Sequence, residues 1–208
     1  MRIPTTVSLG VALLLAFACS VQAYDFFYSV QQWPGSYCDT SSGAVIRPME
    51  SPNQILQFTV SGPIMRMIQD IQSSLQTYWP SLHCPSSNSS SLWADEWATH
   101  GTCSETTLDE HSYFQDALYF KNQTFILQCL KSKAIFPNGG SYMLDSIITA
   151  LTSCLGHVPG IGCNQDTSGR YQLYLVYLCI NPSGTLLMDC PVYPSSGCGS
   201  SVVYFPSF

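Results

Sequence analysis

The order of apolar and polar positions predicts an α+β fold, with helices in the middle of the chain and hairpin strands near its end. Apolar residues recur at helical spacing between Ile64 and Leu75, and this pattern ends at Trp79-Pro80 because proline cannot continue a helix. Similar spacing predicts helices over residues 92–100 and 143–155, and a broken helical region from 114 to 130. Aromatic and β-branched runs, set off by Gly, Pro and Ser turns, predict strands at 26–31, 171–180, 186–189 and 202–205.

Residues 41–62 interrupt this pattern. They mix Pro, Ser and apolar residues without a clean period, and we expect this segment to pack poorly. Elsewhere no repeat and no shift in charge divides the chain, so residues 24–208 are predicted to form one domain. With 46% apolar and 10% charged residues, the composition excludes a disordered chain, a coiled coil and a basic histone-like module.

The first 23 residues have the pattern of a secretory signal peptide. Arg2 precedes a short apolar stretch, and small residues at Val21 and Ala23 favour cleavage after Ala23. Acceptor sequences for N-glycosylation at Asn88 and Asn122 agree with secretion. We therefore expect a secreted or extracellular protein, or one of the vacuole and endomembrane system, without a membrane span.

Cleavage would leave 185 residues with a net charge of −7 and nine cysteines. An oxidising compartment favours disulfides, and an odd number leaves at least one thiol over. The expected protein is a monomer in which this thiol could form an intermolecular disulfide.

The densest cluster of polar side chains lies in residues 93–103, WADEWATHGTC. On a helix Glu96 and His100 are four residues apart and share a face, so they can approach one site. A histidine beside a carboxylate suits general acid–base catalysis, because imidazole exchanges protons near neutral pH. An ordinary exposed helix face is the competing interpretation. A metal site using Asp95, Glu96 and His100 lacks further ligands, so no metal or other cofactor is expected.

This run resembles the second active-site motif of the ribonuclease T2 family, Trp-x-His-Glu-Trp-x-Lys-His-Gly-Thr-Cys. Other segments resemble that family in order along the chain, most closely its plant S-like branch. They are residues 27–38 (FYSVQQWPGSYC), 79–85 (WPSLHCP), 162–164 (GCN), 172–179 (QLYLVYLC), 189–191 (DCP) and 198–199 (CG).

The resemblance implies a ribonuclease T2-like fold, with a central antiparallel sheet, helices packed on it and disulfide staples. It also implies RNA, rather than DNA, as the partner, cleaved endonucleolytically without a metal through a 2′,3′-cyclic phosphate. Because the chain is acidic, we expect its binding of RNA to be weak. By position His100 matches the motif's second histidine, the base, and Glu96 matches its carboxylate. Gln32, Trp33 and Trp93 are weaker candidates for contacts with RNA, and a core role for Trp33 is an equal alternative.

The chain also departs from the family pattern. The first active-site motif, Ile-His-Gly-Leu-Trp-Pro, is absent from residues 41–62, and Asp95 and Thr99 replace the family's histidine and lysine. Asp95 beside Glu96 would place like charges where a phosphate must bind. Losing a general acid costs on the order of 10²–10⁴ in rate, and losing electrophilic stabilisation roughly 10²–10³ more. His83, His111 and His157 lie outside any such motif, and we expect them to be structural or surface residues.

Disulfide pairings implied by the resemblance are Cys163–Cys198 and Cys179–Cys190. The family partners of Cys38, Cys84 and Cys103 would lie in the missing region, and Cys129 and Cys154 have no assigned counterpart. A decayed paralogue and a gene model that skipped an exon both explain the loss, although a skipped exon does not explain Asp95 or Thr99. Two functions follow: a ribonuclease with severely impaired activity, or a non-enzymatic storage, stress-associated or binding protein.

Overall fold

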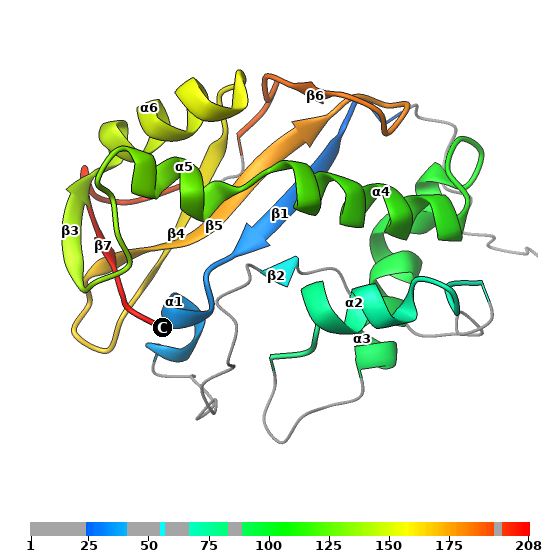
Figure 1. Cartoon of the computed structure of the whole chain (residues 1–208), viewed down its shortest axis with the longest axis horizontal. Helices are drawn as coiled ribbons and strands as arrows, with labels where there is room; N and C mark the ends of the chain where they lie inside the picture. The colour runs from blue at the N-terminus through cyan, green and yellow to red at the C-terminus, as the bar shows by residue number, and fades with distance from the viewer. Residues whose placement is uncertain (1–23, 41–54, 57–66, 83–88, 194–196) are drawn as a thin grey trace, which may run out of the picture.

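The computed structural model describes residues 24–40, 55–56, 67–82, 89–193 and 197–208 (Figure 1). The predicted signal peptide, almost all of segment 41–62, and the individual predictions on His83, Cys84 and Asn88 lie outside these residues.

Strand β5 (Tyr171–Ile180) is the centre of the sheet. Strand β1 (Phe27–Gln32) runs antiparallel along one edge of it, and β4 (Gly160–Gln165) and β6 (Leu187–Met188) pair with its opposite edge. Strand β7 (Val202–Phe205) makes a parallel bridge to β5, the one parallel pairing among the described strands, and β3 (Gly140–Met143) pairs with β7. The short β2 (Ile55–Leu56) pairs with the end of β1.

Helices bury two apolar clusters. The first lies between the sheet and helices α5 (Ile126–Ser132) and α6 (Leu144–Leu155). The second joins α2 (Gln72–Tyr78), α3 (Ser89–Glu96) and α4 (Glu110–Gln123). Figure 1 shows α4 and α5 following one another across the face of the sheet, so the two clusters lie side by side along it. Within the described part of the chain, no helix is long and apolar enough to cross a bilayer.

Local sequence signals set several of these boundaries. Asp109 caps α4 by accepting a hydrogen bond from the backbone N–H of Ser112 at 2.8 Å. Pro34 occupies the first turn of the short helix α1 (Pro34–Cys38), where its missing N–H costs nothing. Gly156 ends α6 at a φ of +80°, a conformation that favours glycine.

Three disulfides connect described residues. The two pairings implied by the family resemblance, Cys163–Cys198 and Cys179–Cys190, are both present. A third disulfide joins Cys129 of α5 to Cys154 of α6. The sequence analysis could assign no partner to either cysteine.

Cys103 is also disulfide-bonded. The expectation that its partner had been lost with the missing segment is therefore wrong.

Candidate functional site

The polar cluster in residues 93–103 does not form one regular helix. Helix α3 ends at Glu96 and continues as a π turn, η2 (Trp97–Gly101), and then as a 3₁₀ turn, η3 (Thr102–Ser104). A Cβ at Gly101 would overlap ring carbon Cε3 of Trp97, so only glycine lets the indole pack against this backbone. The widened turn differs from the predicted continuous helix, and single π turns often occur at functional sites.

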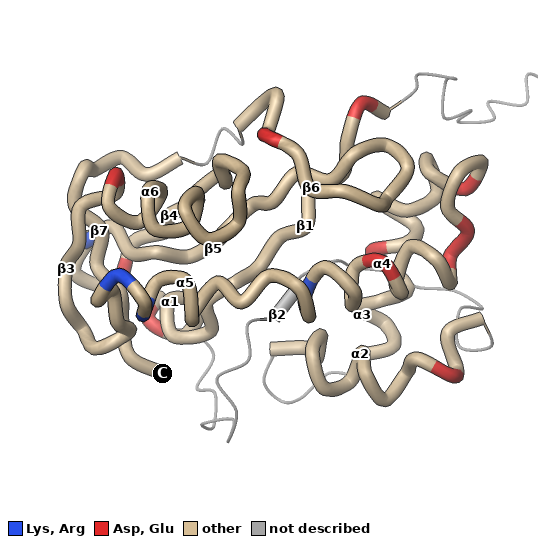
Figure 2. The backbone as a smooth tube through the Cα atoms, turned by 45° about the horizontal axis from the view of Figure 1, so that its top comes forward, with Lys and Arg blue, Asp and Glu red and all other residues tan. Residues whose placement is uncertain are grey.

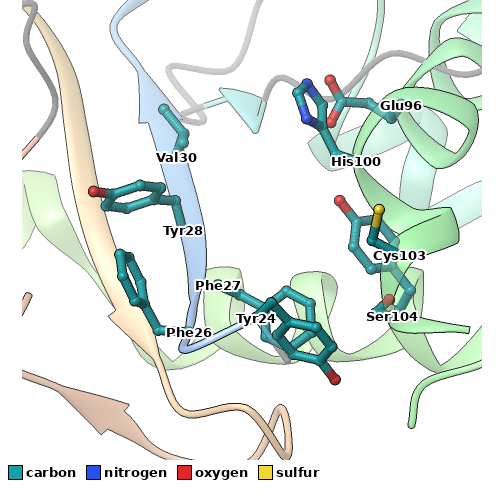
Figure 3. A pocket seen from close by; sticks show the side chains of 10 residues that line it. Tyr24, Phe26, Phe27, Tyr28, Val30, Glu96, His100, Cys103 and Ser104 are labelled. Carbon is teal, nitrogen blue, oxygen red and sulfur yellow. The ribbon is translucent and has the colours of Figure 1, made fainter. Parts of the chain in front are cut away.

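These turns and β1 enclose a pocket of about 280 Å³. Glu96 and His100 both line it, as the four-residue spacing predicted. Figure 3 shows their side chains next to one another at one end of the pocket, across from the strand. Cys103, Ser104 and Tyr113 complete the helical side.

Glu96 is 3% exposed, and burial raises the pKa of its carboxyl to about 9. The carboxyl is therefore protonated and uncharged near neutral pH. Burial also raises the pKa of the Tyr113 hydroxyl well above its usual value, and a charge on Glu96 would raise it further. At neutral pH this end of the pocket holds two uncharged O–H groups and the His100 imidazole.

Asp95 and Thr99 are exposed and are not among the described residues that line the pocket. The expected pair of like charges at the phosphate position is absent near neutral pH, because Glu96 is uncharged and Asp95 lies outside the pocket. No described Lys or Arg lines the pocket either. Lys121 lies on α4 with its ammonium 5.9 Å from the Tyr78 ring centre, and burial lowers its pKa. Figure 2 shows several acidic residues around α4 and others spread along the molecule, whereas most described cations lie at the end near α5 and β7.

Residues 24–190 match the family model described as the Ribonuclease T2 family. The chain belongs to the ribonuclease T2 family. It is 40% identical to extracellular ribonuclease LE of Solanum lycopersicum, over 97% of each chain. The crystal structure of RNase NT in complex with 5′-AMP superposes with a TM-score of 0.77 at 39% identity, covering 90% of this chain and all of that one. A ribonuclease-like storage protein of Panax ginseng is 26% identical over 77% of this chain and 72% of its own length.

The alignment with ribonuclease LE spans 226 positions, 18 more than the 208 residues of this chain. At least that many positions of the relative therefore have no counterpart here.

The three residues of this T2-family chain that the sequence offered as candidates for contacts with RNA are all buried. Trp33 is buried and packs edge-on against Phe205, and its Nε1 donates to the Pro206 carbonyl at 3.0 Å. Trp93 is fully buried, and its Nε1 donates to the carbonyl of Trp79 at 3.0 Å. The structure thus gives both indoles core packing and an internal acceptor.

Gln32 is also fully buried. Its Nε2 donates to the Tyr174 hydroxyl at 2.5 Å, so the amide nitrogen is engaged within the sheet.

Two of the other histidines form exposed pairs with carboxylates. His111 contacts Asp70 at 3.0 Å, and His157 contacts Asp189 at 3.3 Å. Neither histidine lines the pocket. These contacts are of the structural or surface kind predicted for these histidines.

Sequence reasoning missed the aromatic side of the pocket. It is formed from β1 and the residues just before it, and its members are Tyr24, Phe26, Phe27 and Tyr28, with Val30 beyond them. The signal was present as the run YDFFY at residues 24–28, which the strand prediction treated only as a source of β propensity.

Proposed function

We propose that this ribonuclease T2-family protein is secreted, binds RNA only weakly, and cleaves RNA with severely impaired activity or none. The observation that carries the proposal is the reduced set of groups around His100. Among the described residues, His100 is the only histidine of the pocket, and no Lys or Arg accompanies it.

Cleavage through a 2′,3′-cyclic phosphate makes three chemical demands. A base must take the proton of the 2′-hydroxyl, an acid must protonate the departing 5′-oxygen, and positive charge must stabilise the phosphorane. His100 suits the first role. A protonated Glu96 can donate a proton, as carboxyls with a raised pKa do in other enzymes, and could supply residual activity as the acid.

The third demand has no candidate among the described side chains of the pocket. Absent electrophilic stabilisation costs roughly 10²–10³ in rate, and a poorly matched acid about 10²–10⁴. Together these losses support activity several orders of magnitude below that of an intact site. The missing first motif and the 18 surplus positions of the alignment agree with this reading.

RNA cleavage by the purified secreted chain, from acidic to neutral pH, tests the proposal beside a His100→Ala control. Equal, near-background rates for both proteins are the expected result. Substantial turnover that His100→Ala abolishes would show that the remaining groups are sufficient, and would overturn the impairment.

A non-enzymatic storage or binding role is the second candidate. It is favoured by the likeness to the ginseng protein, whose name describes a ribonuclease-like storage protein. High abundance in the source tissue, together with absent turnover, would support this role over that of a weak enzyme.

Secretion is supported by the signal-peptide pattern, although the relatives include proteins named as extracellular and as intracellular ribonucleases. Amino-terminal sequencing of the protein from culture medium tests secretion directly, with Tyr24 as the expected first residue.

A further inference from the structure

The acceptor sequence for N-glycosylation at Asn122 lies where helix α4 ends. Asn122 is exposed on the last turn of α4, and Thr124 is the residue at which the helix stops. Tyr119, three residues before Asn122 and therefore on the same side of the helix, is 53% exposed. A bulky polar group on Asn122 would project into solvent, so the folded domain can carry an N-linked oligosaccharide at this position.

The other half of the acceptor sequence is buried. Thr124 is 1% exposed, and its hydroxyl makes two hydrogen bonds inside the protein. It donates to the carbonyl of Phe120 at 2.6 Å and accepts from Nε2 of Gln31, on β1, at 2.6 Å. The first bond uses the single proton of the hydroxyl, and the second connects the end of α4 to the sheet. Figure 1 shows α4 continuing into α5 at this point, across the face of the sheet.

Transfer of a glycan requires both residues of the acceptor sequence. The bond between the first sugar carbon and a lipid pyrophosphate breaks, a bond from that carbon to Nδ2 of the asparagine forms, and the lipid pyrophosphate and one amide proton are released. The transferase recognises the hydroxyl two residues later, which is why the acceptor pattern contains Ser or Thr. In the folded protein Asn122 is exposed whereas the Thr124 hydroxyl is bonded to β1, so the enzyme cannot contact both.

We propose that Asn122 carries an N-linked oligosaccharide that is added before α4 docks on β1, and that folding then closes the site to modification. The Thr124 hydroxyl serves first in the acceptor sequence and afterwards as a buried link between helix and sheet. The inference rests on the proposed secretion, because N-glycans are added to secreted chains. It does not depend on RNA binding or cleavage.

A transfer reaction with purified oligosaccharyltransferase and a lipid-linked oligosaccharide tests this order of events. The substrate is the full chain made without N-glycans, either folded with its disulfides formed or reduced and unfolded, and circular dichroism verifies each state. Every protein carries Asn88→Gln, which removes the chain's other acceptor sequence, so an increase in mass reports Asn122 alone. Thr124→Val lacks the hydroxyl, and Thr124→Ser is the matched control that keeps it.

The unfolded chain is expected to gain the oligosaccharide. The folded chain should gain it at least about 10-fold more slowly, because the two hydrogen bonds of Thr124 must open first. When unfolded, Thr124→Ser should be modified and Thr124→Val should not. Mass spectrometry of the chain secreted by cells should find the oligosaccharide on the peptide that contains Asn122.

Equal rates for the folded and unfolded chains would overturn the proposed order, and an unfolded chain that is not modified would overturn Asn122 as an acceptor. A secreted chain whose Asn122 peptide carries no glycan would overturn the modification while leaving secretion intact. A chain that never reaches the culture medium would refute secretion instead, and the transfer reaction would still decide whether folding closes the acceptor sequence.

Discussion

Replacing Glu96 by glutamine tests the electrostatic state of the pocket. Glutamine is similar to a protonated carboxyl in size and shape and can donate and accept hydrogen bonds, but it cannot ionise. In the folded protein burial raises the pKa of Glu96 to about 9 from an ordinary value of 4.5. Unfolding exposes the carboxyl, which then ionises above its ordinary pKa and stabilises the unfolded chain.

The sign and size of the effect follow from proton linkage. Because the folded-state pKa is the higher one, the stability contributed by protonated Glu96 is complete below about pH 4.5 and is lost as pH rises toward 9. Each pH unit in that window costs about 1.4 kcal/mol. At pH 7 the native chain should therefore have lost roughly 3 kcal/mol of unfolding free energy that Glu96→Gln retains.

Urea unfolding with the disulfides intact, at pH 5, 6, 7 and 8, measures this difference. The two proteins should be nearly equally stable at pH 5 and diverge as pH rises, with the variant the more stable. Other titrating groups cancel in the comparison. Glu105→Gln makes the same chemical change on an exposed side chain of this region and should stay within about 0.5 kcal/mol of the native chain throughout. A constant gap between Glu96→Gln and the native chain from pH 5 to 8 would mean that Glu96 is ionised in the folded state, and would refute the uncharged pocket.

Three further changes test the fold around the site. Replacing Cys129 and Cys154 together by serine opens a 25-residue loop and should cost about 3–4 kcal/mol, seen as a melting temperature roughly 7–14 °C lower; an unchanged value would refute the pairing. Thr124→Val removes the hydroxyl that accepts from Gln31 Nε2 at 2.6 Å, and should cost about 1–3 kcal/mol in unglycosylated protein, whereas Thr124→Ser should restore most of it. Gly156→Ala forces a side chain onto a left-handed residue and should cost about 1–2 kcal/mol of unfolding free energy in urea, with a stabilised variant contradicting the helix end described here.

Elements with a strong local pattern could be predicted from the sequence. The strand predicted at 171–180 is β5, the strand predicted at 202–205 is β7, and the helix predicted over 143–155 is α6 with one residue fewer. The broken helical region also divides as expected, because α4 ends at Gln123 and α5 begins at Ile126. In these segments apolar periodicity and turn residues indicate the same structure.

Strands with weak local signals could not be predicted. Strand β4 contains two glycines, and β3 begins with Gly140 and is only four residues long. They are strands because β4 hydrogen-bonds to the edge of β5 and β3 hydrogen-bonds to the edge of β7. This pairing is a tertiary effect, which local sequence does not show. The same limit applies to the site. The spacing predicts that Glu96 and His100 approach one another, but the burial that neutralises Glu96 is a result of tertiary packing, which no local pattern contains.

Phosphate binding and RNA cleavage make different demands on the charges of this pocket. An ionised Glu96 would repel a phosphate, so the burial that keeps it protonated favours an anionic ligand near His100. The same neutrality withholds the negative charge that would stabilise a histidine after it accepts a proton, and no described cation in the pocket offsets charge on a phosphorane. The neutrality of Glu96 thus has opposite consequences for two steps: it removes a charge that would repel a phosphate, and it removes a charge that would assist proton transfer to His100.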